Sequence, residues 1–166
     1  MNIRDARKDE VQAIRKQRLQ AYSIYAKAIN QNHWQALKQA ISSDADIQPG
    51  VELLVAEHEG IALGSAALFP ANTDAYQGHV EELDYPEIRV LAVTPEAQGK
   101  GVASALIEEC IHRAKAKGYC WIGLHTGAFM HGAIRLYERV GFERLPQYDF
   151  EPANDGIIVK AFRKAI

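Results

Sequence analysis

The chain has 166 residues, of which 48% are hydrophobic and 24% are charged, and its formal net charge is -2. A chain of this length buries a core without disulfides or bound metal, so we expect one domain over residues 1–166. The absence of an overall positive field argues against a nucleic-acid partner. No apolar run approaches the about 20 residues of a membrane span, and Met1–Asp5 lacks the apolar segment of a signal peptide. We therefore expect a cytoplasmic protein that does not bind membranes.

The first part of the chain predicts a short strand followed by two helices. A strand at residues 3–4 precedes a helix over about 10–29, where apolar residues recur at helical spacing. Asp9 is the expected N-cap of this helix, and Gln12 completes a capping-box pattern. Asn32 is the expected N-cap of the second helix.

The middle of the chain predicts strands. Residues 51–57 and 61–69 form a hairpin pattern with a turn near Glu59–Gly60. Residues 70–86 predict an irregular segment, and long ordered loops are often functional. Residues 87–93 then read as a strand that is buried on both faces, because their apolar run is nearly continuous.

The segment from Glu87 to Gly118 combines this strand, a short turn with Pro95, two glycines and an amphipathic helix. Glycine lets the backbone come close to a ligand, and the first N–H groups of a helix lack internal partners. These N–H groups and the positive end of the helix dipole favour a phosphate. The segment therefore predicts a cradle for the pyrophosphate of a cofactor.

The last part of the chain predicts a strand over 119–124, a helix over 130–140, a strand start at Phe142 and a last strand over 156–162. The predicted order is β-α-α-β-β-β-α-β-α-β-β, which is an α+β fold and not a repeated βαβ pattern. The two cysteines, Cys110 and Cys120, form no CxxC pair. We expect both to be reduced core residues.

Two well-known phosphate motifs do not fit the cradle. A P-loop needs Lys-Ser or Lys-Thr after its second glycine, whereas here Lys100 lies between the glycines and Val102 follows them. A dinucleotide fingerprint needs three glycines at the first βα turn, whereas here Ala103 takes the third position and the turn comes late in the chain.

Two segments resemble motifs of one family. Gln98, Gly101 and Ala103, with the lead-in Leu91–Ala97, resemble the acyl-CoA-binding motif of the GNAT superfamily of N-acetyltransferases, which is Arg or Gln, two residues, Gly, one residue, and Gly or Ala. Ala133–Phe142 resembles the Leu-Tyr-x-x-x-Gly-Phe segment of that family. The order of the predicted elements is also the family's, and two motifs at the right separation are more specific than either alone.

The resemblance implies a GNAT-like, mixed and mostly antiparallel sheet, flanked by helices, in which two central strands splay apart. It implies acetyl-CoA as co-substrate and transfer of its acetyl group to an amine, by direct attack in a ternary complex. A backbone N–H near Leu91 or Val93 would stabilise the oxyanion; core packing is the other role open to these residues. The implied cofactor-binding residues are Leu91, Ala92, Val93, Gln98, Gly99, Lys100, Gly101, Val102, Ala103, Ser104 and Tyr137.

The resemblance also implies catalytic residues. Tyr137 is the expected acid that protonates the departing CoA thiolate, and the alternative is a tyrosine that only packs beside Leu136. Glu87 and His125 are alternative bases, with a water-mediated route as a third possibility. Without a catalytic role, Glu87 is a solvated strand end and His125 a loop residue. The histidines lack metal-ligand spacing, so no metal is expected.

The acceptor is the least defined part of the expected reaction. A small-molecule amine is the main hypothesis, and the alternatives are a protein N-terminus or lysine, or a non-catalytic acyl-CoA-binding module. Family members are often dimers, so the resemblance also allows a homodimer. Six residues either border the acceptor or have ordinary roles in packing and in a solvated loop, namely Tyr22, Tyr25, Trp34, Glu81, Glu82 and Asp84.

Overall fold

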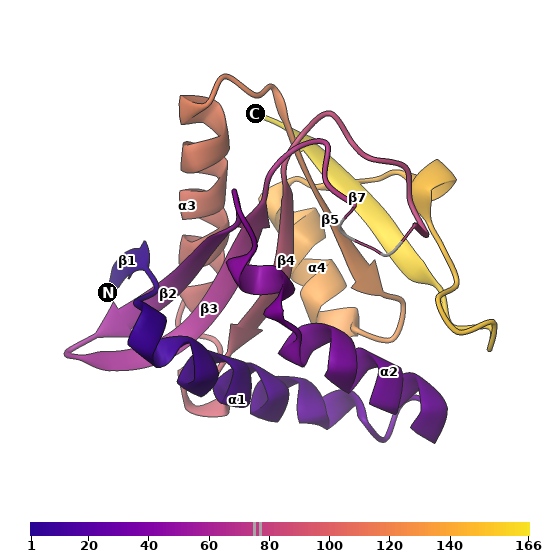
Figure 1. Ribbon diagram of the computed structural model, residues 1–166, viewed down its shortest axis with the longest axis horizontal. Coiled ribbons are helices and arrows are strands. Elements are labelled where there is room, and N and C mark those ends of the chain that lie inside the picture. Colours follow the sequence, from indigo (N-terminus) through magenta and orange to yellow (C-terminus); the bar gives the residue numbers. More distant parts are fainter. Residues whose placement is uncertain (75, 77) are drawn as a thin grey trace.

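A central β-sheet organises the protein, whose computed structural model describes residues 1–74, 76 and 78–166 (Figure 1). In the described residues its seven strands are β1 (Asn2–Asp5), β2 (Glu52–His58), β3 (Ile61–Phe69), β4 (Glu87–Val93), β5 (Trp121–Gly127), β6 (Glu143–Arg144) and β7 (Val159–Ala165). They lie in the order β1-β2-β3-β4-β5-β7-β6, and only the β4–β5 pair is parallel. The predicted α+β fold with a mixed, mostly antiparallel sheet is confirmed.

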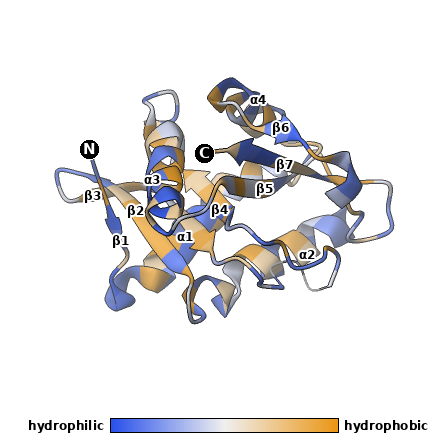
Figure 2. Ribbon diagram, turned by 90° about the horizontal axis from the view of Figure 1, so that it is seen from above, coloured by the Kyte–Doolittle hydropathy of each residue, from blue (hydrophilic) through white to orange (hydrophobic). Residues whose placement is uncertain are grey.

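Helices cover both faces of this sheet, because each face is apolar and must be buried. Helices α1 (Val11–Tyr22) and α2 (Gln31–Ser42) lie on one side, and α3 (Val102–Ala116) and α4 (His131–Val140) on the other (Figure 2). The predicted order of strands and helices is thus observed. In the described part of the chain, no helix is long and apolar enough to cross a membrane.

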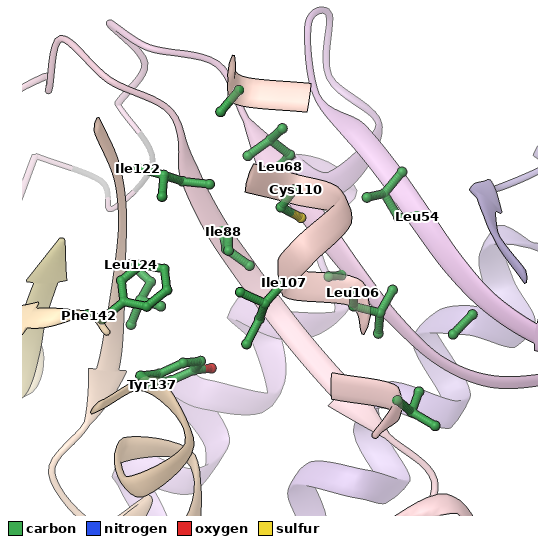
Figure 3. Close-up of a cluster of buried hydrophobic side chains, with 14 of the residues drawn as sticks. Leu54, Leu68, Ile88, Leu106, Ile107, Cys110, Ile122, Leu124, Tyr137 and Phe142 are labelled. Atoms are coloured by element: carbon green, nitrogen blue, oxygen red, sulfur yellow. The ribbon is translucent and has the colours of Figure 1, made fainter. Parts of the chain in front are cut away.

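The larger core lies between the sheet and the α3–α4 layer (Figure 3). Strand side chains alternate between the two faces, so Leu54 belongs to this core and Val55 to a smaller one beneath α1. One stripe of α3 is completely buried, and it comprises Leu106, Ile107, Cys110 and Ala114. This spacing on one helical face anchors α3 firmly, so the loop before it has a fixed position.

Helix α1 is shorter than the predicted helix over 10–29. It ends at Tyr22, and the chain continues as a 3₁₀ turn over Ser23–Tyr25. The N–H of Ser23 donates to the carbonyls of both Leu19 and Gln20, as is common where an α-helix changes into a tighter turn. The regular α-helix therefore ends at this point.

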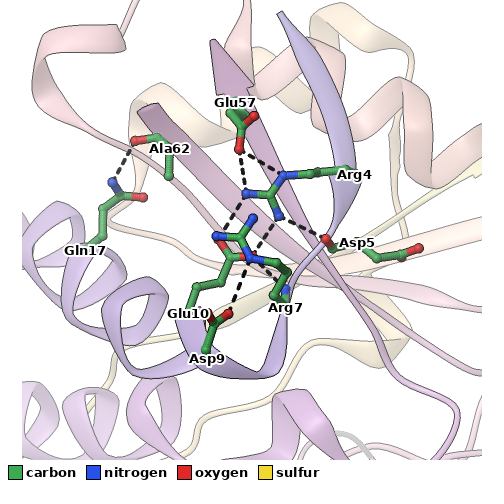
Figure 4. A network of polar contacts seen from close by, with 8 residues as sticks. All are labelled: Arg4, Asp5, Arg7, Asp9, Glu10, Gln17, Glu57 and Ala62. Carbon is green, nitrogen blue, oxygen red and sulfur yellow. Dashed lines mark hydrogen bonds and ion pairs between the residues drawn. The ribbon is translucent and has the colours of Figure 1, made fainter. Parts of the chain in front are cut away.

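A polar network fixes the start of α1 against the sheet (Figure 4). Arg4 donates to Glu10 at 2.7 Å and to Glu57 at 2.6 Å, which joins β1 to β2 and to the turn before α1. The hydrogen bond from Arg4 lowers the pKa of Glu10 to about 2. Glu10 also holds the N-cap position of α1, so Asp9 is not the N-cap that the sequence predicted, and the Glu10 side chain accepts from the N–H of Arg7.

The start of α2 is held by a different set of contacts. Asn30, and not the predicted Asn32, caps the helix, since its side-chain oxygen accepts from the N–H of His33 at 2.8 Å. Asn30 Nδ2 and His33 Nδ1 each lie 2.8 Å from Asp155 Oδ2. The cap thereby connects α2 to the loop before β7.

Two late strands begin after their predicted starts. The N–H of Tyr119 donates to the carbonyl of Ala114 at 3.1 Å, so Tyr119 belongs to the end of α3 and not to β5. Cys120 lies between this helix end and the strand and is exposed, which corrects the prediction that it is a core residue. Gly156 has a φ of 83° and belongs to a turn, so β7 begins only at Val159.

Candidate active site

The two parallel strands separate after a short contact. Glu87 pairs with Gly123 and Ile88 with Leu124, and beyond these two positions β4 and β5 diverge. A cavity of about 770 Å³ lies at this opening, lined by residues of both strands and of α1, α2 and α4. This volume is in the range of small-molecule and cofactor sites.

Strand β4 carries a bulge where it borders the cavity. Ser65 pairs with Ala92 and Ala67 with Arg89, so β4 has one residue more than β3 between these pairs. Val90 in the bulge has a φ of 50°, which is rare for a β-branched residue. A bulge leaves its extra residue outside the ladder, and the whole run 89–93 lines the cavity. Backbone groups of this run, which includes the predicted Leu91, Ala92 and Val93, can therefore serve a ligand.

The predicted phosphate cradle lies at the end of β4. The run Gln98–Gly101 is exposed, and Gln98 also lines the cavity. Gly99 and Gly101 have φ values of 75° and 82°, and a Cβ added at either would meet nothing within 4 Å. The first hydrogen bond of α3 runs from Ala105 N–H to Gly101 C=O, so the N–H groups of residues 102–104 have no partner inside the helix. The loop before α3 thus combines open space for a ligand with N–H donors that have no partner inside the helix.

Val102 contributes to the cradle only through its backbone. Its side chain is 2% exposed and packs in the larger core, whereas Lys100 beside it is exposed. Ala103 and Ser104 are half-buried. The side chain of Val102 therefore fixes this loop to the core, while the other side of the loop faces solvent.

Tyr137 reaches the cavity from α4. Gly141, with a φ of 104°, ends this helix, and the N–H of Phe142 donates to the carbonyl of Tyr137 at 2.9 Å. The ring packs against Phe142, with ring centroids 6.1 Å apart (Figure 3). It also packs against Phe162, with ring centroids 6.4 Å apart. Burial raises the pKa of Tyr137 well above its usual range, so the phenol stays protonated and can donate a proton.

The two expected bases, Glu87 and His125, lie together. His125 Nδ1 is 2.9 Å from Glu87 Oε2, and Nε2 is 3.0 Å from the carbonyl oxygen of Tyr148. A carbonyl only accepts, so Nε2 carries a hydrogen, and a further proton must lie between Nδ1 and the carboxylate. Both side chains are buried, and His125 lines the cavity whereas Glu87 does not reach its wall. Glu87 is therefore no solvated strand end, and His125 is part of β5.

The sequence profile of the Acetyltransferase (GNAT) family matches residues 12–142. The chain belongs to this family. Among its relatives, the uncharacterized N-acetyltransferase YjgM of Escherichia coli is 33% identical over 98 residues, which cover 59% of this chain and 54% of YjgM. The chain thus spans about half the length of this curated relative, and the match to the uncharacterized N-acetyltransferase MJ1207 of Methanocaldococcus jannaschii covers 29% of that protein.

Solved structures of GNAT proteins share the fold. The PaiA N-acetyltransferase of Thermoplasma acidophilum, in complex with coenzyme A, aligns with a TM-score of 0.72 and 16% identity over 99% of this chain and 98% of that one. The acetyltransferase yncA of Salmonella typhimurium, with its cofactor acetyl-CoA, aligns with a TM-score of 0.65 and 20% identity over 99% of this chain and 93% of that one. The likeness confirms the GNAT fold implied by the sequence motifs.

Aromatic side chains form the cavity walls of this GNAT protein away from the cradle. One group consists of Tyr22, Tyr25, His33 and Phe129, and the other consists of Tyr76, His79, His125 and Phe150. Of the residues considered for the acceptor side, Tyr22 and Tyr25 therefore line the cavity, whereas Trp34 does not. Glu81, Glu82 and Asp84 are exposed and lie outside its lining.

Arg89 is a site residue of this GNAT protein that the sequence analysis missed. Its guanidinium lies over the rings of Phe69 and Tyr76, 4.9 and 4.4 Å from their centroids, and it lines the cavity. A charged residue inside an otherwise apolar buried strand was the available signal, since buried charges need a specific reason. Among the described residues, no group of three or more His, Cys, Asp or Glu side chains is placed to hold a metal ion.

Proposed function

We propose that this protein transfers the acetyl group of acetyl-CoA to the primary amine of a small molecule, by direct attack in a ternary complex. One observation carries the proposal: a cavity joins Gln98 at the cradle, the bulge of β4, and the side chains of Tyr137 and His125. The groups that would hold the cofactor and those that would perform the chemistry thus share one cavity.

The cradle and β4 would hold acetyl-CoA. The N–H groups of residues 99–104 would bind its pyrophosphate, and the pantetheine arm would lie along the free edge of β4. An N–H near Leu91 or Val93 would then polarise the thioester carbonyl, and loss of such a donor typically costs about 10²–10³ in rate. The bulge at Val90 supports this assignment, because it removes that part of β4 from regular pairing.

Tyr137 serves as the acid in this proposal. The amine nitrogen bonds to the acetyl carbon, the carbon–sulfur bond breaks, and the phenol gives its proton to the leaving thiolate. A thiol with a pKa near 8.5 leaves more readily when a proton is supplied. The place of Tyr137 in the cavity lining supports the role, and burial keeps the phenol protonated until the thiolate forms.

The ammonium proton of the acceptor is proposed to leave through water in the cavity. Both ring nitrogens of His125 are engaged, one by Glu87 and the other by the Tyr148 carbonyl, which favours this route over direct transfer to the imidazole. Glu87 and His125 then act as a hydrogen-bonded pair that positions the cavity wall and its water. A small amine is favoured because the aromatic rings of Tyr76 and Phe150 line the acceptor side of the cavity.

Release of CoA thiol from acetyl-CoA tests the proposal. The protein is mixed with acetyl-CoA and a panel of small primary amines, peptides with free N-termini, and lysine peptides. Faster release with a small amine than with any peptide supports the proposal, and the reverse order favours a protein acetyltransferase. Tight acetyl-CoA binding with no release for any amine would instead identify a non-catalytic module.

A further inference from the structure

Several apolar side chains on the α1–α2 side of the cavity are open to it. Ile24, in the turn after α1, is 60% exposed and lines the cavity. On α2, Ala36 and Ala40 are exposed and Leu37 is half-buried, and all three line the cavity. Helical residues three and four positions apart share a face, so α2 presents an apolar face to the cavity. Such a surface is stabilised when an apolar ligand covers it.

Phe129 adds an aromatic wall that its neighbours hold in place. Its ring makes T-shaped contacts with Tyr25, at a centroid distance of 5.6 Å, and with His33, at 5.9 Å. His33 is itself fixed, because its Nδ1 lies 2.8 Å from Asp155 Oδ2. Gly127 makes room for the Phe129 ring, since a Cβ at this glycine would lie 2.5 Å from it. Phe129 and Tyr25 therefore form a preformed aromatic surface.

This aromatic surface is close to the proposed acid. Burial raises the pKa of Tyr137 most, and the nearby phenols of Tyr22 and Tyr25 raise it further. Tyr22 and Tyr25 are in contact with each other, with ring centroids 6.0 Å apart, and all three tyrosines line the same cavity. An acceptor that lies on Tyr25 and Phe129 can therefore present its nitrogen to an acetyl group beside Tyr137.

The charges on the cavity wall disfavour an acceptor with several positive charges. Among the described lining residues, Asp74 supplies the one carboxylate, and it is exposed and accepts from the N–H of Gly78. The guanidinium of Arg89 lies over the rings of Phe69 and Tyr76. A second ammonium group would meet this positive charge on a wall that is otherwise mostly apolar. The wall therefore favours an acceptor whose one charge is on the reacting amine.

We propose that the acceptor is an arylalkylamine, in which a short alkyl chain joins the primary amine to an aromatic ring, and that this ring contacts Phe129 and Tyr25. This inference rests on the proposed acetyl transfer and names the class of its acceptor. Aromatic rings pack against one another edge-to-face or offset, and such a contact stabilises a complex beyond the burial of apolar area alone. The apolar face of α2 then shields the acceptor from water.

Matched amines test the inference on the unmodified protein. CoA release is measured with phenethylamine, cyclohexylethylamine, ethylamine and a linear diamine as long as phenethylamine, and kcat/KM is expressed for the unprotonated amine. Phenethylamine should exceed ethylamine by about 10- to 100-fold because its ring is buried, and cyclohexylethylamine by about 2- to 10-fold because the contact is aromatic. Equal values for the phenyl and cyclohexyl amines, or a faster diamine, would overturn the inference while leaving acetyl transfer intact.

Binding gives a readout that does not need turnover. Calorimetric titration of phenethylamine and of cyclohexylethylamine into the CoA-bound protein should show tighter binding of phenethylamine. If no amine releases CoA but phenethylamine still binds more tightly, the aromatic site stands and acetyl transfer fails. If the two amines bind equally, the aromatic site fails.

A variant without the aromatic ring locates the contact. Phe129→Leu keeps an apolar side chain, so the phenyl-to-cyclohexyl ratio of kcat/KM should fall to about one, mainly through KM. Thermal melting confirms that the variant is folded. An unchanged ratio in Phe129→Leu would contradict contact between Phe129 and the acceptor ring.

Two exposed isoleucines form a matched pair for the apolar side of the site. Ile24 is 60% exposed and lines the cavity, whereas Ile47 is 54% exposed and lies outside its lining. Ile24→Ala should lower kcat/KM for phenethylamine by about 3- to 10-fold through lost apolar contact, and Ile47→Ala should leave it unchanged. Equal effects of the two substitutions would contradict an acceptor that lies on this side of the cavity.

Discussion

Glu87 Oε2 lies 2.9 Å from His125 Nδ1, and this contact bridges two strands whose backbones pair at only two positions. Gly123 makes room for it, because a Cβ there would lie 3.3 Å from Glu87 Oε2 and 2.6 Å from the ring of Tyr85. The pair therefore lies where the strands are still paired, directly before they separate, and only its His125 member lines the cavity.

Replacing Glu87 by Gln tests what this pair does. The amide oxygen of the glutamine can still accept from Nδ1–H of His125. The negative charge of the Glu87 carboxylate, which holds the proton shared with His125, is lost, so we expect acetyl transfer to slow by about 10- to 100-fold. With the proposed route through water, the logarithm of kcat/KM should still rise linearly with pH as the amine deprotonates, in wild type and variant alike. A flat profile in the wild type that turns into a linear rise in Glu87→Gln would instead identify the pair as the base.

Tyr137→Phe removes the proposed acid and little else. The ring can keep its packing against Phe142 and Phe162, so acetyl-CoA affinity by calorimetry should change by less than about threefold. Without the proton donor, kcat should fall by about 10²–10⁴-fold. Unchanged turnover in this variant would reduce Tyr137 to a packing residue.

Gly101→Ala tests the cradle, and Gly118→Ala is its matched control at the other end of α3. The two glycines have φ values of 82° and 88°, and an added Cβ would meet nothing within 4 Å at either position. Both variants should therefore lose a similar stability, about 1 kcal/mol, from backbone strain alone. Only Gly101→Ala should weaken acetyl-CoA binding, by about tenfold or more, because its methyl group occupies the phosphate approach. Equal affinity in the two variants would contradict a phosphate site at Gly101.

Buried phenols should make the fold sensitive to alkali. Burial raises the pKa of both Tyr22 and Tyr85 to about 12, whereas an unfolded phenol ionises near 10. Between these values the unfolded chain releases protons that the folded chain keeps, so the free energy of unfolding falls as pH rises, by up to about 1.4 kcal/mol per pH unit for each phenol. Urea unfolding of wild type and Tyr85→Phe between pH 9 and 12 should show the smaller loss in the variant. Parallel losses would contradict the role of Tyr85.

The cradle and α4 could be predicted because their causes are local. Positive φ at Gly99 and Gly101 and the helix start that follows them depend on neighbouring residues, and so does the helix end at Gly141 that positions Tyr137. Such features depend on residues that lie only a few positions apart in the sequence. A short sequence motif is therefore enough to predict them.

The acceptor side depends on contacts between distant parts of the chain. Glu87 and His125 meet because of the parallel register of β4 and β5, which no local periodicity encodes, so they were expected only as alternatives. Tyr25 and Phe129 come together although they lie far apart in the sequence. The first helix was predicted too long, because the spacing of apolar residues does not distinguish an α-helix from the 3₁₀ turn at Ser23–Tyr25.

The two-position pairing of β4 with β5 also leaves the sheet incomplete. Within the described residues it joins a four-stranded half-sheet, β1 to β4, to a three-stranded half, β5 to β7. A pantetheine arm seated between the halves would act as a splint that restores the missing ladder. The cofactor would then be a structural member of the sheet, and amide exchange along 90–93 would report its arrival before any chemistry begins.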